Sequence, residues 1–282
     1  MPPWLGDGKT AVITGAAGGI GLETARRFAG FGMNVVMADT KAGTLSEEAE
    51  TLASQGIKRD QILAEPCDVS DPKALEALSE KAQSRFGPVH CLMNNAGIGR
   101  MGPKPWEDLG AFHEMIGINL FGVVNGCHAF IPAMLEHGEP AAVINTASKQ
   151  GITRPPGNYA YNLSKAGVLA YTESLAHAFR TENGCQLTAH LLIPAFVYTP
   201  MVARFIPEKP PFAATAEETV AFMLDRLKDG DFYILCPDNE TPRALDEKRI
   251  QWTADDLIKN RPALSRWHPD YEAEYKAFIE GA

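Results

Sequence analysis

The sequence predicts a doubly wound α/β fold, a seven-stranded and mostly parallel sheet with helices on both faces. Short runs rich in Val, Ile and Leu alternate with longer helical segments, which is the order of βαβ units. Several runs, such as Ala11-Val12-Ile13, are apolar at every position. Strands with that pattern are covered on both faces, as parallel strands are.

Seven segments are strand candidates, and each is followed by helical sequence or by turn residues. No internal repeat or linker divides the chain before residue 200, so we expect one domain over residues 1–237. In chain order the expected strands are Thr10–Thr14, Asn34–Asp39, Gln61–Cys67, Val89–Met93, Ala141–Thr146, Leu187–Ile193 and Phe232–Cys236.

Two regions depart from this alternation. Residues 199–214 contain four prolines among apolar side chains, too many for a regular helix, yet the segment is too apolar for a solvated linker. Residues 238–282 form a C-terminal helical extension, in which Tyr271, Tyr275 and Phe278 are spaced to share one helix face. We expect that face to pack on its own chain, with a partner or substrate contact as the alternative.

The composition excludes several functions. Hydrophobic residues make up 45% and charged residues 22% of the 282 positions, which is ordinary for a globular protein. The 26 Lys and Arg against 35 Asp and Glu give a net charge of −9, which disfavours nucleic-acid and anionic-membrane partners. Residues Met1–Asp7 do not have the pattern of a secretory signal, and we expect no membrane-spanning run of about 18 apolar residues. We therefore expect a cytoplasmic protein with a small-molecule substrate.

The five cysteines are scattered and odd in number, and none belongs to a Cys-x-x-Cys pair. No spacing of His and Cys suggests zinc, so we expect no metal site. Reduced, structural thiols are the simplest interpretation, and a nucleophilic cysteine is disfavoured because Cys91 and Cys236 lie in apolar runs.

A glycine-rich loop follows the first strand and opens the helical segment Leu22–Phe31. Such glycines let the backbone approach a pyrophosphate, whose charge then rests on the helix N-terminus. Three glycines at this spacing are weak evidence alone, but the strand before and the helix after support a Rossmann-type dinucleotide site. The expected cofactor-binding residues of the loop are Gly15, Gly18, Gly19, Ile20 and Gly21.

Asp39 ends the second strand, where a carboxylate can accept hydrogen bonds from the adenosine ribose and repel a 2′-phosphate. It favours NAD over NADP, although Lys41 could still reach such a phosphate. The alternative is that Asp39 serves only as a helix cap or turn residue.

Tyr161 and Lys165 are four residues apart in the helical segment Asn158–Arg180, so phenol and ammonium share one face. A nearby cation stabilises a phenolate, and we expect it to lower the pKa of Tyr161. Ser148 ends the fifth strand, at the edge where open α/β sheets bind ligands. A chance Tyr-Lys spacing and a turn serine are the alternatives. A Ser-His-Asp hydrolase is disfavoured because the segment around Ser148 lacks the first glycine of a Gly-x-Ser-x-Gly elbow.

Together the motifs resemble the short-chain dehydrogenase/reductase family over residues 8–237. The resemblance is carried by Thr14-Gly15-x-x-x-Gly19-x-Gly21, by Asn94-Asn95-Ala96-Gly97, and by Asn119. Ser148, thirteen residues before Tyr161, and Tyr161-x-x-x-Lys165 complete it. Two positions depart from the family pattern: Ala195 follows Pro194 where glycine is usual, and Ala147 replaces a common second serine.

The resemblance implies that Tyr161 is the general acid/base, that Lys165 lowers its pKa and binds the nicotinamide ribose, and that Ser148 orients the substrate oxygen. Asn119 would kink its helix and hold a water that leads protons to solvent. Residues 199–214 would form a mobile substrate lid. The further implied cofactor contacts are Asp68 and Val69 at the adenine, Asn95, Ala96 and Gly97 in the groove, and Pro194, Val197 and Thr199 at the carboxamide.

The resulting hypothesis is hydride transfer between NAD(H) and a secondary alcohol or ketone. Apolar side chains in and near the lid favour a hydrophobic substrate, and the candidate contacts are Gln150, Phe196, Met201 and Phe205. The family also implies a homo-oligomer, a dimer or tetramer built on the helices of residues 112–137 and 158–180. The alternatives are a catalytically silent dinucleotide sensor or scaffold and, less favoured, a methyltransferase.

Overall fold

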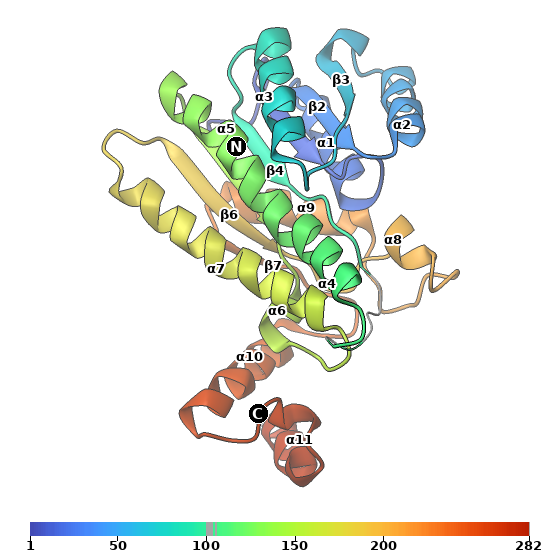
Figure 1. Cartoon of the computed structure of the whole chain (residues 1–282), viewed down its shortest axis with the longest axis vertical. Helices are drawn as coiled ribbons and strands as arrows, with labels where there is room; N and C mark the ends of the chain where they lie inside the picture. Colours follow the sequence, from blue (N-terminus) through green and yellow to red (C-terminus); the bar gives the residue numbers. More distant parts are fainter. Residues whose placement is uncertain (100–103, 105, 282) are drawn as a thin grey trace.

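A computed structural model describes residues 1–99, 104 and 106–281 and contains a seven-stranded sheet in the order β3-β2-β1-β4-β5-β6-β7 (Figure 1). Every neighbouring pair is parallel. The predicted fold class is therefore confirmed. Four strands have the predicted bounds, and β3, β4 and β7 are shorter or shifted by up to two residues. The strands are β1 Thr10–Thr14, β2 Asn34–Asp39, β3 Ile62–Pro66, β4 Cys91–Asn94, β5 Ala141–Thr146, β6 Leu187–Ile193 and β7 Tyr233–Leu235.

Helices cover both faces of the sheet, each over its own apolar core. Ala11 and Ile13 of β1 belong to one core, with Phe28 of α1, whereas Val12 belongs to the other, with Phe130 of α5. Because successive strand residues point to opposite faces, a strand buried on both sides must be apolar throughout. The helices that precede the C-terminal extension are α1 Gly19–Gly30, α2 Ala42–Ser54, α3 Pro72–Phe86, α4 Leu109–Ile116, α5 Gly122–His137, α6 Lys149–Thr153, α7 Tyr159–Thr181, α8 Pro200–Ala203 and α9 Ala216–Lys228, with a 3-10 turn η1 at Arg59–Gln61.

Local sequence signals set several helix starts. Asp71 caps α3 by accepting a hydrogen bond from the Lys73 amide at 3.0 Å, and Pro72 follows at the first helical position. Thr215 and Glu218 form a reciprocal capping box at the start of α9. These caps satisfy amide groups that the first helical turn leaves without partners.

The run Leu109–His137 is longer and more apolar than the sequence analysis expected. It joins α4, a π-helical segment η2 at Gly117–Phe121 and α5 into 29 residues, with a mean hydropathy of 1.4 over its most apolar 18 residues. By length and composition alone, it could cross a membrane. In this fold Met115, Val123 and Phe130 are buried, and the run packs against α7 and β4.

The C-terminal extension packs around Trp252 and projects beyond the end of the sheet (Figure 1). Tyr275 and Phe278 each place their ring centroids 5.2 Å from that of Trp252. Tyr271 lies outside the helix and contacts His268 instead, so the predicted three-residue face is wrong at Tyr271. The extension comprises α10 Arg243–Ile258, 3-10 turns η3 Ser265–Trp267 and η4 Pro269–Tyr271, and α11 Glu272–Glu280.

All five cysteines are free thiols, and four of them are buried. Burial raises the pKa of Cys67 to about 11 and that of Cys236 to about 12, so both stay protonated near pH 7. Within residues 1–99, 104 and 106–281, no three His, Cys, Asp or Glu side chains are placed to hold a metal ion.

Candidate active site

The glycine loop and the segment after β4 touch through positions where only glycine fits. Gly15 has a φ of 68°, and a Cβ added there would lie 2.8 Å from the Cα of Ala96. A Cβ on Gly21 would lie 2.2 Å from the Gly15 carbonyl oxygen. These close approaches explain why the spacing needs glycine, and they place the two predicted motifs together at the carboxyl edge of the sheet.

Thr14 holds the two motifs in register. Its Oγ1 accepts hydrogen bonds from the amides of Asn95 at 2.9 Å and Ala96 at 3.0 Å. Asn95 in turn donates from Nδ2 to the Thr14 carbonyl oxygen at 3.1 Å and accepts from Thr146 at 3.3 Å. From sequence alone, Thr14 was only the first residue of the glycine motif and Thr146 had no role, although a threonine at the carboxyl end of a strand is a signal that could have found both.

The N-terminus of α1 is open to an anion. The cap residue, Gly18, offers no side-chain acceptor to the amides of the first turn. Those amides carry the positive end of the helix dipole, which suits a pyrophosphate. Ile20 packs on the core below, and Thr199 approaches within 3.0 Å of where a Gly19 Cβ would lie. Loop, helix and residue types therefore fit a dinucleotide.

The carboxylate of Asp39 reaches the glycine loop from the end of β2. It accepts hydrogen bonds from the amides of Ala17 at 3.2 Å and Lys41 at 3.1 Å. Asp39 is thus a turn residue as well as a neighbour of the loop, and Lys41 occupies the N-cap position of α2 without a side-chain capping bond. The Asp39 carbonyl oxygen accepts from the Cys67 amide at 3.0 Å, which brings the exposed Asp68 and the buried Val69 to the same edge.

Ser148, Tyr161 and Lys165 come together beside the end of β5. Ser148 caps α6 by accepting a hydrogen bond from the Gln150 amide at 3.2 Å. Lys165 is 4% exposed, and its Nζ donates to the Thr146 carbonyl oxygen at 2.8 Å. The same Nζ lies 5.8 Å from the centre of the Tyr161 ring.

The pKa of Tyr161 is shifted in the direction opposite to that expected. Burial of the phenol raises this pKa, while a side-chain hydrogen bond with Ser148 opposes the rise. Burial also lowers the pKa of Lys165 to about 8. The expectation that the cation lowers the pKa of Tyr161 is therefore wrong for this structure, because desolvation of the phenol dominates.

Asn119 lies in the π-helical segment between α4 and α5, where the resemblance implied a kink. Its Oδ1 accepts from the Ile98 amide at 2.8 Å, and its Nδ2 donates to the Ile98 carbonyl oxygen at 2.9 Å. A Cβ on Gly97 would lie 3.2 Å from Asn119 Oδ1 and 3.8 Å from Lys165 Nζ. Gly97 thus lies between the two side chains, and π-helical turns of this kind are frequent at functional sites.

The predicted substrate contacts are only partly brought to this cluster. The sulfur of Met201 would lie 2.9 Å, and the Tyr161 ring 3.9 Å, from a Cβ on Gly99. Phe196 packs on Phe212, with ring centroids 5.3 Å apart, and Phe205 is 63% exposed.

The other candidate contacts near the sixth strand are also placed by the structure. Gln150 is half-buried on α6. The Pro194 carbonyl accepts from the Lys149 amide at 3.2 Å, and Val197 forms an isolated bridge to Ala214. The end of this segment, Ala214, therefore returns to Phe196–Tyr198 just after β6, and Thr199 lies next to Gly19 of the glycine loop.

Comparisons with known proteins agree with this geometry. A sequence model of the short chain dehydrogenases matches residues 9–210. The chain is 33% identical over 265 residues to 1-deoxy-11-beta-hydroxypentalenate dehydrogenase of Streptomyces arenae, covering 92% of this chain and 93% of that protein.

Two solved structures are similar along most of the chain. A short chain dehydrogenase/reductase from Burkholderia phymatum in complex with NAD superposes with a TM-score of 0.82 at 31% identity, covering 93% of this chain and 98% of that one. An alcohol dehydrogenase from Thermococcus sibiricus complexed with 5-hydroxy-NADP gives 0.69 at 27% identity, covering 78% and 90%. The glycine loop, the pairing of Tyr161 with the buried Lys165 and these matches together show that the chain belongs to the short-chain dehydrogenase/reductase family.

Proposed function

We propose that this oxidoreductase transfers a hydride between NAD(H) and a secondary alcohol or ketone, with Tyr161 as the proton-transfer group. The observation that supports it most is the meeting of Ser148, Tyr161 and Lys165 beside the glycine loop. When bound, the nicotinamide would supply or accept the hydride, and the protein must supply the matching proton.

The side chains suit that task. Because burial raises the pKa of Tyr161, its phenol is protonated at pH 7 and can donate to a carbonyl oxygen. Ser148 would orient that oxygen, while Lys165 would bind the nicotinamide ribose. Asn119 would order the backbone near Gly97 and hold a water on the proton path.

Asp39 supports NAD as the cofactor, because its carboxylate already reaches the loop amide of Ala17 and would repel a 2′-phosphate. The residues proposed to hold the dinucleotide are those of the loop, Gly15, Gly18, Gly19, Ile20 and Gly21, together with Asp39, Asp68, Val69, Asn95, Ala96, Gly97, Pro194, Val197 and Thr199.

A hydrophobic substrate is supported by Met201, whose sulfur lies near Gly99 as the Tyr161 ring does, and by the Phe196–Phe212 pair in the proposed lid. The Streptomyces arenae relative is named for a hydroxylated substrate, 1-deoxy-11-beta-hydroxypentalenate. Turnover of cyclic and aryl ketones should therefore exceed that of sugars and short hydroxy acids, measured by NADH absorbance in both directions. Preference for the polar set would contradict a hydrophobic substrate, and NADH binding without any turnover would contradict the enzymatic proposal.

The homo-oligomer, the cytoplasmic location and the boundary between the domain and its C-terminal extension at residue 237 stay predictions. The homo-oligomer is supported by the exposure of Phe121 in η2 and of Tyr159 and Leu163 on α7. Light scattering at micromolar concentration should give a dimer or tetramer, and a monomer alone would contradict it.

A further inference from the structure

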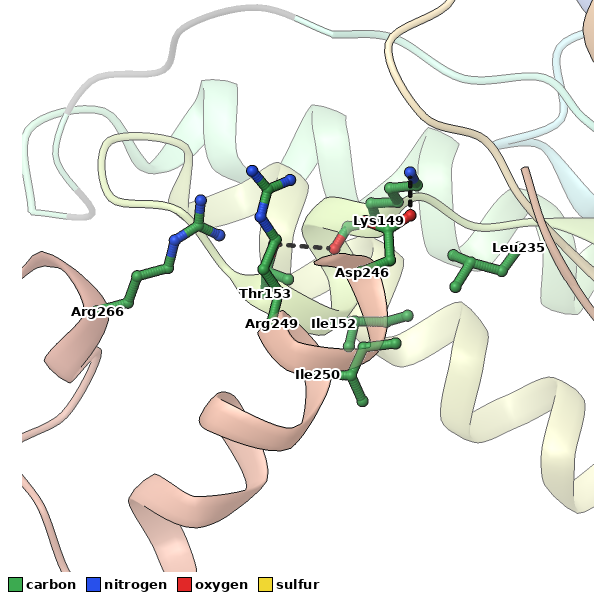
Figure 2. Close-up of a pocket in the computed structure, with 8 residues that line it drawn as sticks. All are labelled: Lys149, Ile152, Thr153, Leu235, Asp246, Arg249, Ile250 and Arg266. Carbon is green, nitrogen blue, oxygen red and sulfur yellow. Dashed lines mark hydrogen bonds and ion pairs between the residues drawn. The ribbon is translucent and has the colours of Figure 1, made fainter. Parts of the chain in front are cut away.

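A small cavity lies at the seam between α6 and the C-terminal extension, and two arginines line it. Its volume is about 40 Å³. Arg249 of α10 and Arg266 of η3 extend in roughly the same direction, and Ile152 and Ile250 lie near the base of Arg249 (Figure 2). Lys149 and Asp246 also line the cavity. The wall is therefore apolar on one side and charged on the other, with three cations and one carboxylate.

The other charges at this seam are already paired. Lys149 bonds to Asp246 (Figure 2), which is 6% exposed on its side chain, and also lies 3.7 Å from Asp238. The two carboxylates thus face the ammonium of Lys149. This buried ion pair attaches α10 to α6, the helix that Ser148 caps.

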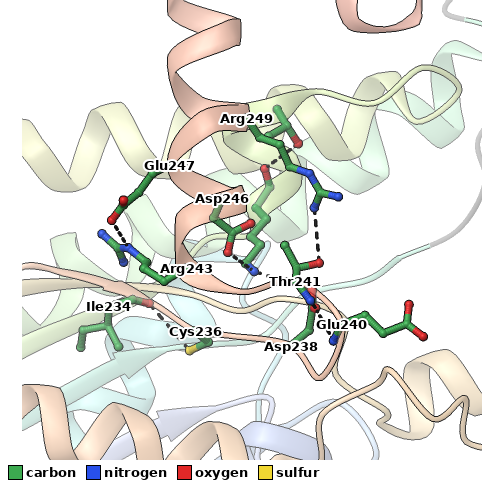
Figure 3. Close-up of polar contacts among 11 residues, drawn as sticks. Ile234, Cys236, Asp238, Glu240, Thr241, Arg243, Asp246, Glu247 and Arg249 are labelled. Atoms are coloured by element: carbon green, nitrogen blue, oxygen red, sulfur yellow. Dashed lines mark hydrogen bonds and ion pairs between the residues drawn. The ribbon is translucent and has the colours of Figure 1, made fainter. Parts of the chain in front are cut away.

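The arginines, by contrast, have no ion-pair partner among the residues that the structure describes. Arg249 donates only to the neutral Thr241 hydroxyl, at 3.4 Å (Figure 3), and its buried Nε has no hydrogen-bond partner among the described residues. The guanidinium of Arg266 stacks over Trp267 and Tyr275, at 4.8 and 5.3 Å from their ring centres.

Two neighbouring cations in a partly buried place repel each other, and Asp246, the one carboxylate of the lining, is already paired with Lys149. Burial lowers the pKa of Arg266, and the charge of Arg249 lowers it further, whereas Asp246 and Tyr275 oppose the shift. An arginine nevertheless stays charged at pH 7. Because one water needs about 10–15 Å³ of such space, the cavity has room for roughly three heavy atoms, the size of a carboxylate group.

We propose that Arg249 and Arg266 bind an oxyanion, a carboxylate or its inorganic equivalent, in this cavity. Guanidinium groups match oxyanions in geometry and charge, and Ile152 and Ile250 suit a hydrocarbon next to the anion. The protein carries a net charge of −9, so these arginines supply a local attraction that the whole surface does not.

The anion could belong to the substrate or be free in solution. Ser148 caps the start of the five-residue α6 and Thr153 is its last residue, about 6–8 Å away. A hydrophobic alcohol with a carboxylate some bonds away from its carbinol could therefore bind both ends of the helix. Assigning the anion to the substrate rests on the proposed function, whereas anion binding itself does not.

The direct test is thermal unfolding of the full chain in sodium formate, sodium acetate or sodium chloride at matched ionic strength. Formate and acetate should raise the wild-type Tm above that in chloride, and Arg249→Gln should remove at least half of the difference. Arg266→Gln should act in the same way. Arg243→Gln is the control, because this arginine lies on the same helix, is 61% exposed and pairs with Glu247. No added stabilisation by either oxyanion, or equal stabilisation in Arg249→Gln, would overturn the proposal.

Kinetics then separate the two sources. Acid and primary-amide forms of one hydrophobic alcohol are compared by kcat/KM in wild type and Arg249→Gln. If the substrate supplies the carboxylate, wild type should prefer the acid about tenfold or more, and the variant should lose that preference through KM. An unchanged ratio alongside formate binding that requires Arg249 would assign the site to a free oxyanion. Absence of turnover would contradict the proposed function and leave the formate result to decide the anion site.

Discussion

Lys165 places its ammonium nitrogen 5.8 Å from the centre of the Tyr161 ring while donating a 2.8 Å hydrogen bond to the Thr146 carbonyl oxygen. The helical spacing of the two residues brings them to one face of α7, and the strand carbonyl fixes the lysine there. A buried cation is thus held next to the proposed proton-transfer group by the backbone of β5.

Replacing Lys165 with methionine should stabilise the fold while impairing turnover. Lowering its pKa from 10.5 to about 8 costs the folded state about 3 kcal/mol, since the unfolded lysine binds its proton more tightly. Loss of the bond to Thr146 offsets about 1 kcal/mol, so Lys165→Met should gain about 2 kcal/mol at pH 7. This gain should shrink between pH 8 and 10.5. Urea unfolding measures it against the exposed-site control Lys41→Met, and a destabilised Lys165→Met would contradict this account.

Asp39→Ala should narrow the preference for NADH over NADPH. The variant loses the carboxylate that faces the glycine loop, and removing a charged hydrogen-bonding partner costs about 1.5–3 kcal/mol, or about tenfold or more in affinity. Fluorescence titration with each cofactor gives the ratio without a substrate. The exposed Glu47→Ala on α2 should leave the ratio unchanged, and an unaltered ratio in Asp39→Ala would reject the proposed role of Asp39.

Acid should destabilise the protein through two buried histidines. Burial lowers the pKa values of His90 and His190. Below the unfolded value of about 6.5 the unfolded chain therefore binds more protons, and stability falls by at most about 1.4 kcal/mol per pH unit for each histidine. His90 also accepts a hydrogen bond from the Thr10 amide through Nδ1, which protonation would remove.

Urea unfolding between pH 5 and 8 should show this loss in wild type. The slope of the unfolding free energy against pH should flatten in His90→Gln and His190→Gln. It should persist in the exposed control His177→Gln. Equal slopes in all four proteins would show that the buried histidines do not control the loss of stability in acid.

Gly21→Ala should disrupt the glycine loop. The added Cβ would lie 2.2 Å from the Gly15 carbonyl oxygen, and such overpacking costs about 1–3 kcal/mol. NADH affinity should fall together with the stability, because the glycine loop must shift to make room for the Cβ. Gly43→Ala is the matched control, since no atom lies within 4 Å of its added Cβ and alanine favours a helix by about 1 kcal/mol. Unchanged NADH affinity in Gly21→Ala would contradict the role given to the loop.

Much of the fold could be predicted because each strand of a parallel sheet is a short apolar run. The runs around Val12 and Val143 are buried on both faces, and a continuous apolar pattern bounded by turn residues is typical of such strands. The glycine spacing of the loop and the four-residue interval between Tyr161 and Lys165 likewise reflect local backbone geometry. Both motifs can therefore be recognised without knowing which distant residues they contact.

Features that depend on tertiary contacts could not be predicted from sequence. The direction of the Tyr161 pKa shift depends on desolvation, which the interval to Lys165 does not reveal. The π-helical turn at Asn119 depends on its bonds to Ile98, 21 residues earlier. Arg249 and Arg266 belong to no motif, and only the docking of α10 on α6 brings them to one cavity.

Single-turnover hydride transfer by Tyr161→Phe tests the central claim most directly. With the best alcohol from the substrate panel and saturating NAD, the variant should form NADH about 10²- to 10⁴-fold more slowly than wild type. Its NADH affinity, from fluorescence titration, should stay within about twofold, since only the phenolic oxygen is removed. Hydride transfer at the wild-type rate in Tyr161→Phe would contradict the account.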